Sequence, residues 1–346
     1  MSSAPTTTKG DDRVQARSSL AGLLSTPEVG ALIGAVAVMV LFLAVAPTFR
    51  SMAAIGTIGY QASTIGMMAV PVALLMIGGE FDLSAGVSMT TSALVASMFS
   101  WQFGTNLWVG VLVALLVALA VGFLNGWLLM RTKLPSFLVT LGTFFILQGF
   151  NLAMTKRVTG GVTSPRISDM DGFDAAQKVF ATEVNIGSVN LKVTVLIWIL
   201  LTIIGAIVLR KTQIGNWILA VGGDQDAARA VGVPVTAVKI GLFMFVGFCA
   251  WLLGMHTLFN FGSVQSNIGV GDEFIFIIAA VVGGCLLTGG YGSVIGASLG
   301  ALIYGMTNLG ITYAGWNPDW LKTFLGIMLV LATLVNTYIR RQAEKR

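Results

Sequence analysis

The chain has 346 residues, of which 55% are hydrophobic and only 10% are charged. A soluble globular domain has about 25% charged residues, so this composition excludes an ordinary soluble protein of two domains. The net charge of +5 comes from basic residues that never cluster with aromatic side chains on a polar face. The sequence therefore gives no sign of a nucleic-acid-binding surface.

The N-terminal residues 1–27 are polar and rich in Ser and Thr, without the apolar core or cleavage pattern of a signal peptide. We expect them to form a disordered cytosolic tail. Charge-free apolar segments follow, and a helical span needs about 20 such residues. We therefore predict an all-α polytopic membrane protein, with one transmembrane domain over 28–339 and a second cytosolic tail over 340–346. About ten transmembrane helices are expected, at 28–47, 55–77, 83–100, 107–130, 135–153, 193–209, 238–260, 274–290, 292–310 and 321–339.

The basic residues predict the orientation of these spans. Lys and Arg are concentrated at 131–133, 210–211 and 340–346, and an even number of spans places all three groups on one side. Because cytoplasmic loops carry the excess of Lys and Arg, both termini are predicted to be cytoplasmic. The loop over 155–192 is then the largest outside segment. Its mixed charges suit a solvated surface that could receive a partner.

The first motif, GGEFDLSAG, covers 78–86 and lies between two predicted spans. Gly79 allows a close approach of the backbone, and the topology places Glu80 and Asp82 at the cytosolic boundary. Asp82 or Ser84 could cap the helix that follows, where a negative charge is also favourable. A simple turn with a cap explains most of these features.

A polar stripe follows one face of the predicted helix 135–153. In lipid, such a stripe must face protein or water. It either lines a translocation path or makes hydrogen bonds between helices. The stripe contains Thr140, Thr143, Gln148 and Asn151, with Phe144 beside it.

The cytosolic loop 210–239 contains a short helix with clear end signals. Asp224 is a good N-cap, about two helical turns follow, and Gly232 suits the position after the helix. Ala227 and Ala228 leave a small, smooth face. Such a helix is either a docking element for a cytosolic partner or an ordinary capped loop between two spans.

Several other functions have little support in the sequence. The chain has no GxxxxGK[ST] motif, so it cannot hold ATP in a P-loop. Nearly all spans lack ionisable residues, which argues against a secondary transporter coupled to protons or sodium. His256 has no second His or Cys pair nearby, which predicts a structural residue and no metal site, and Cys249 and Cys285 are expected in the core. An intramembrane serine protease could be imagined only from Ser298 and His256, so no catalytic residue is expected.

Four segments together resemble the permease subunits of bacterial ABC sugar importers, of the ribose, xylose and galactose type. These sugar permeases lie within the branched-chain amino acid permease superfamily, and the resemblance covers roughly residues 50–340. The segments are GGEFDLSAG (78–86), LPSFLVTLGT (134–143), GNWILAVGGDQDAARAVGV (215–233) and VVGGCLLTGGYGSVIGASLGALI (281–303).

This resemblance implies a type II permease fold like that of the vitamin B12 importer, in the bacterial inner membrane. It implies two permease copies around a central path, a separate ABC ATPase subunit that binds ATP and Mg, and an extracytoplasmic sugar-binding protein outside. No cofactor is expected in this chain, and the chain itself is not expected to be an enzyme. The 78–86 motif would either lie where parts of the permease move against each other during the conformational change or contact the ATPase. The residues implied in coupling to the ATPase are Gly222, Gly223, Asp224, Ala227, Ala228, Arg229 and Gly232.

The polar stripe also bears on the substrate. A neutral sugar needs hydroxyl partners and aromatic faces, and the stripe offers these without a deep charge. The expected substrate is therefore a monosaccharide, with branched-chain amino acids or another small polar solute as the alternative. A short internal similarity joins LPSFLVTLGT to NPDWLKTFLG (317–326), which begin predicted spans five apart. This spacing predicts an inverted repeat, as in many transporters.

Overall fold

The computed structural model describes the backbone of residues 27–344 and the side chains of 28–335. A helix covers at least part of every predicted span. These helices are α2 (Pro27–Val45), α3 (Met52–Ile77), α4 (Ala85–Phe103), α5 (Leu107–Thr132), α6 (Ser136–Thr159), α8 (Val193–Lys211), α11 (Val235–Phe261), α12 (Asp272–Val282), α13 (Val294–Tyr313) and α14 (Trp320–Glu344). Short elements lie between them: a 3-10 helix (Pro47–Arg50), α7 (Phe173–Phe180), β1 (Glu183–Ile186), β2 (Val189–Lys192), α9 (Gln213–Gly223) and α10 (Gln225–Ala230). The predicted N-terminal tail lies outside the described residues, and α14 continues beyond the predicted end of the last span.

Within the described part of the chain, 7 helices are long and apolar enough to cross a membrane. The chain is thus a multi-pass membrane protein. Of the three remaining helices, α4 and α12 do not meet that criterion, and α14 is apolar over its described side chains, Trp320–Val335. Helix α4 is rich in Ser and Thr and is almost entirely buried, so it does not need a lipid-facing apolar surface.

Helix α12 corrects the prediction of a span over 274–290. It has 11 residues and ends at Val282, so it is about 16 Å long, whereas the hydrocarbon core is about 30 Å thick. The Gly-rich segment that follows is not helical. Gly284, Gly289 and Gly290 have positive φ angles, which a continuing helix cannot contain. On the other side of α12, segment 262–271 is also non-helical.

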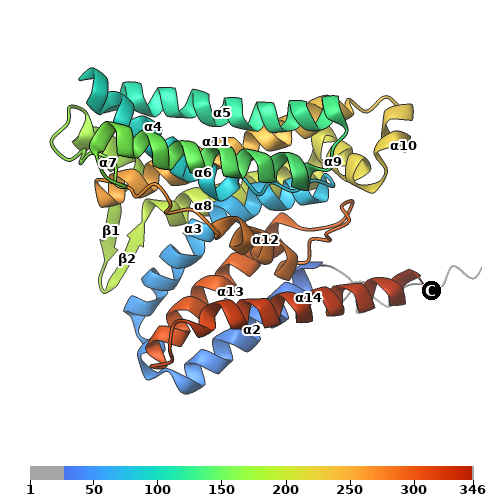
Figure 1. Cartoon of the computed structure of the whole chain (residues 1–346). Coiled ribbons are helices and arrows are strands. Elements are labelled where there is room, and N and C mark those ends of the chain that lie inside the picture. The colour runs from blue at the N-terminus through green and yellow to red at the C-terminus, as the bar shows by residue number, and fades with distance from the viewer. Residues whose placement is uncertain (1–26, 345–346) are drawn as a thin grey trace, which may run out of the picture.

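Two layers of helices enclose α3 (Figure 1). Helices α4, α5, α6 and α11 lie on one side, and α2, α13 and α14 on the other. Helix α3 packs most extensively on α13, and α11 packs most extensively on α5. Likewise α4 packs on α5 and α6, while α12 packs on α13 and α14. These contacts match when helices five spans apart are exchanged, which agrees with the predicted internal repeat.

The segment between α6 and α8 is not helical throughout, so the all-α prediction is wrong in detail. Strands β1 and β2 form an antiparallel hairpin in which Glu183 pairs with Lys192 and Ile186 with Val189. Gly187, at φ +62°, begins the two-residue turn, and tight hairpin turns require such a positive φ. The residues that favour a strand form only short runs here, and charged residues stand at their outer ends, so the sequence did not indicate a hairpin.

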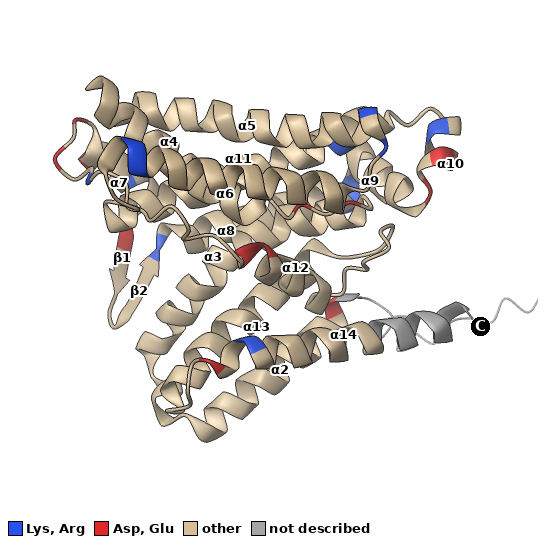
Figure 2. Ribbon diagram, in the orientation of Figure 1, with Lys and Arg blue, Asp and Glu red and all other residues tan. Residues whose placement is uncertain are grey.

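Charged residues mark the two ends of the bundle (Figure 2). One group surrounds α7, and another surrounds α9 and α10, while the ribbon between them carries few charges, among them the acidic residues at the beginning of α12. We refer to these ends as the α7 end and the α10 end. This distribution is expected of a protein with its middle in hydrocarbon and its ends in water.

Candidate functional site

Three of the four sequence motifs meet at the α10 end, in what we call the glycine junction: Gly79, Gly222, Gly289 and Gly290. The backbones touch so closely that a Cβ on Gly222 would overlap the carbonyl oxygen of Ile77 and the amide of Gly290. The Gly290 amide also donates a hydrogen bond to the Ile77 carbonyl at 2.9 Å. The junction therefore fixes the ends of α3 and α9 against the loop after α12.

The fourth motif joins the same region through α6. Ser136 Oγ accepts a hydrogen bond from the Phe81 amide at 3.1 Å, and Thr140 Oγ1 accepts one from the Leu83 amide at 3.1 Å. The non-helical segment 78–84 has buried amides that need partners, and α6 supplies them. Hence all four motifs, far apart in the sequence, form one site.

A buried polar chain starts at Asp82, whose side chain is buried within the bundle. The Asp82 carboxylate accepts hydrogen bonds from the Ser84 amide at 2.8 Å and the Ser84 hydroxyl at 2.6 Å. Asn125 donates to Ser84 Oγ at 3.0 Å and accepts from Thr143 at 2.6 Å. Because Asn125 lies about two turns before the end of α5, this chain is roughly 10 Å inside the bundle. The Ser84 side chain serves this chain and does not cap α4.

Glu80 forms a buried ion pair with Lys239, at the beginning of α11. Both side chains are nearly inaccessible, with exposed fractions of 10% and 7%. Lys239 Nζ also donates a hydrogen bond to Gln225 Oε1, on α10, at 2.6 Å. The sequence analysis did not single out Lys239. The available signal was that Lys239 is the single charged residue of an apolar helix.

Helix α10 has the predicted caps. Asp224 accepts hydrogen bonds from the amides of Asp226 and Ala227, each at 2.9 Å, and Gly232 follows the helix at φ +86°. The predicted small face is not a single surface, however. Ala228 is 3% exposed and packs into the core, whereas Ala227 and Arg229 face outward. The outward surface of α10 is therefore available to a partner, and the Ala228 surface is not.

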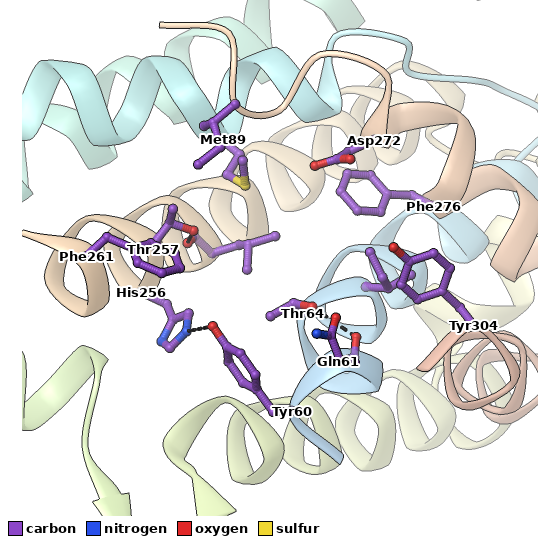
Figure 3. A pocket seen from close by; sticks show the side chains of 13 residues that line it. Tyr60, Gln61, Thr64, Met89, His256, Thr257, Phe261, Asp272, Phe276 and Tyr304 are labelled. Atoms are coloured by element: carbon purple, nitrogen blue, oxygen red, sulfur yellow. Dashed lines mark hydrogen bonds between the residues drawn. The ribbon is translucent and has the colours of Figure 1, made fainter. Parts of the chain in front are cut away.

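A second feature is a cavity of about 200 Å³ between α3, α4, α11, α12 and α13. Figure 3 shows Gln61 and Thr64 from α3 facing Asp272 and Tyr304 across it. Hydroxyl and amide groups alternate with apolar and aromatic side chains around the cavity. Such a lining can bind a small polar molecule through hydrogen bonds and ring contacts.

The β1–β2 hairpin is connected to the wall of this cavity. Tyr60 shares a hydrogen bond of 3.2 Å with His256 Nε2, and Lys192 Nζ lies 4.7 Å from the centre of the Tyr60 ring. Lys192 also pairs with Glu183 at 2.6 Å. Hydrogen bonds from Lys192 and from Asn190 hold the pKa of the Glu183 carboxyl below its ordinary value. The hairpin thus supports Tyr60, which forms part of the cavity wall.

The polar stripe of α6 lies elsewhere, and neither its four residues nor the neighbouring Phe144 line this cavity. Thr140 and Thr143 make the bonds described above, and Asn151 donates to Thr91 on α4 at 3.1 Å. Phe144 packs against its neighbouring aromatic ring, 5.1 Å away between centres, and Gln148 is half-buried. For Thr140, Thr143 and Asn151 the structure therefore favours hydrogen bonding between helices. The sequence reading missed the polar residues of α3, although they interrupt an apolar span.

Comparison with known proteins adds the following. A family model described as the branched-chain amino acid transport system / permease component matches residues 54–333. The fructose import permease protein of Rhizobium meliloti is 30% identical over 82% of this chain and 77% of its own length. A probable ABC transporter permease protein of Escherichia coli is 31% identical over 92% of both chains. The galactose/methyl galactoside import permease protein of Haemophilus influenzae is 29% identical over 84% of this chain and 88% of its own length. No solved structure matches.

Proposed function

The chain belongs to the family of branched-chain amino acid transport system permease components and is a permease of the sugar ABC importer kind, and on this premise we propose how it works. It carries a monosaccharide across the bacterial inner membrane and depends on a separate ATPase subunit for energy. The chain lacks a P-loop, so ATP and Mg²⁺ bind to that partner. An extracytoplasmic sugar-binding protein delivers the substrate.

The observation that carries this proposal is the position of α10. A short capped helix projects from the α10 end and is exposed on one face, and it follows directly after α9, whose Gly222 is packed in the glycine junction. A rigid exposed helix on such a base suits a docking element that receives force from a partner. The excess of Lys and Arg in the neighbouring loops supports a cytosolic location for this end. Both termini are then cytosolic.

The architecture supports alternating access. Broken crossings at the interface between repeats are typical of transporters, and here two of them touch in the middle of the bundle. Segment 78–84 leads into α4, and segment 262–271 leads into α12. A Cβ on Gly86 would overlap the Gly269 carbonyl, so the beginnings of the two helices are in direct contact. We propose that two copies of this type II fold enclose the path, and that the cavity beside α12 lies on it.

The substrate class follows from the cavity and the relatives together. The relatives are named for fructose and galactose import, and the cavity offers Gln61, Thr64 and Tyr304 to hydroxyl groups. A branched-chain amino acid remains the alternative because of the family's description.

Uptake measurements test this proposal. Cells that produce the permease with its own ATPase and binding protein should accumulate labelled fructose, galactose or ribose. Gln61→Ala, in the cavity, should lower the rate of sugar uptake more than the matched control Gln148→Ala, which lies on α6 outside the cavity. Uptake of leucine without competition by any sugar would contradict the proposed substrate.

A further inference from the structure

The buried pair of Lys239 and Glu80 needs a reason beyond stability. Taking both charges out of water is costly, and a buried ion pair often contributes no more than apolar side chains of the same volume. Yet this pair is completed by a third partner, Gln225, whose side chain belongs to α10. The ammonium group thus joins α10, α11 and segment 78–84 at one point. Among the hydrogen bonds and ion pairs of the described residues, no others link α10 to that segment.

From Glu80 a continuous series of contacts leads to the cavity. The segment continues to Asp82, which is held by Ser84, and then enters α4. At the second residue of α4, Gly86 touches the carbonyl of Gly269. One turn later, Thr90 Oγ1 accepts a hydrogen bond from the Gly269 amide at 3.1 Å. The beginning of α12 therefore rests on the beginning of α4.

The last step is within α12 itself. Its first residue, Asp272, lines the cavity, as Figure 3 shows. The next residue, Glu273, is 2% exposed, and its carboxylate accepts hydrogen bonds from the Gly271 amide. Buried groups of this kind cannot slide past one another independently, so a shift of segment 78–84 also shifts this wall of the cavity.

We propose that Lys239 is a positioning residue that transmits movement of α10 to segment 78–84 and, through it, to the cavity end of α12. This inference rests on the proposed function, because it takes α10 as the surface on which the ATPase acts. Lys239 suits the task because an ammonium group has three donors, and here two of them hold acceptors on different segments. Releasing either acceptor would leave a buried polar group without a partner, so the segments move together.

The experiment measures how much ATP is hydrolysed for each sugar transported, with permease, ATPase and binding protein in liposomes. Gln225→Met removes the acceptor on α10 but keeps the side-chain volume and the buried ion pair. It should raise ATP per sugar by about fivefold or more, the usual lower range of an allosteric coupling. Unchanged ATP per sugar in Gln225→Met would overturn the inference.

A charge exchange separates coupling from simple structural support. Glu80→Gln should uncouple transport in the same way. The double variant Glu80→Lys with Lys239→Glu restores an ion pair, and the Gln225 amide can donate to the new carboxylate, so coupling should return toward the parent value. If the charge exchange does not restore the coupling that Glu80→Gln loses, the proposed transmission through Lys239 is contradicted.

A second ion pair at the same end supplies the control. Glu28 pairs with Arg210 and accepts a hydrogen bond from Ser293 at 2.6 Å, without contacting α10. Glu28→Gln should therefore leave ATP per sugar unchanged, and an equal effect there would refute a specific role for Lys239. If the parent complex transports no sugar, the proposed function fails, which differs from a coupled parent whose variants stay coupled.

Discussion

Replacing Gly222 with alanine should destabilise the glycine junction. The new Cβ would overlap backbone atoms of Ile77 and Gly290, and neither can move away by changing a rotamer. The end of α3 or the loop after α12 would have to shift. The hydrogen bond from the Gly290 amide to the Ile77 carbonyl, now 2.9 Å, would be lost or stretched.

The magnitude can be estimated from three contributions. Overpacking a close contact costs about 1–3 kcal/mol. Loss of the hydrogen bond costs about 1 kcal/mol. Alanine in place of glycine in a helix gains about 0.5–1 kcal/mol. The net loss of stability is therefore on the order of 1–3 kcal/mol.

The neighbouring residue provides a matched control. Gly223 lies in the same helix, but a Cβ there would meet nothing within 4 Å. Gly223→Ala should therefore be neutral or stabilising by up to about 1 kcal/mol. The measurement is the apparent melting temperature of the purified permease in detergent, at one fixed heating rate because such proteins often unfold irreversibly. If both variants melt at the same temperature, the close packing at Gly222 does not contribute as described.

Three further predictions concern topology, docking and the polar stripe. Single cysteines at Lys178 and Asp226, in a cysteine-free background, should react with an impermeant reagent from opposite sides of the membrane; labelling of both on intact cells would contradict the orientation. Ala227→Trp should weaken co-purification of the ATPase without lowering the melting temperature of the permease. Ala228→Trp should instead lower the melting temperature, because Ala228 is buried. The reverse pattern would show that the outward face of α10 is not the docking face. Asn151→Ala should lower the stability of the permease by about 1 kcal/mol through loss of its hydrogen bond to α4, and sugar uptake should be unchanged. A lower uptake rate at unchanged stability would indicate that the polar stripe lines the translocation path.

Local features of the fold could be predicted from the sequence. Apolar segments of about 20 residues located the helices, because only a helix satisfies its own backbone in lipid. The ends of α10 were equally predictable, since Asp224 caps amides two and three residues further along the chain and Gly232 adopts the positive φ that follows the helix. Both signals depend only on neighbouring residues.

The site could not be predicted in the same way because its contacts are long-range. Glu80 and Lys239 are 159 residues apart in the sequence, and the residues around either one do not indicate that the two side chains form a pair. The sequence of α6 shows a polar face but cannot show whether that face meets a cavity or another helix. The short α12 was missed because its apolar character continues into a glycine-rich loop, and hydropathy does not distinguish a helix from a tightly packed loop.

Helices α4 and α12 also have a consequence for biogenesis. Each is a poor substrate for the membrane-insertion machinery, α4 because it is polar and α12 because it is short. Each is followed in the chain by a helix that does qualify as a span, α5 and α13 respectively. Since insertion responds to the apolar content of a segment, we expect α4 and α12 to enter the bilayer together with their successors, as helical pairs.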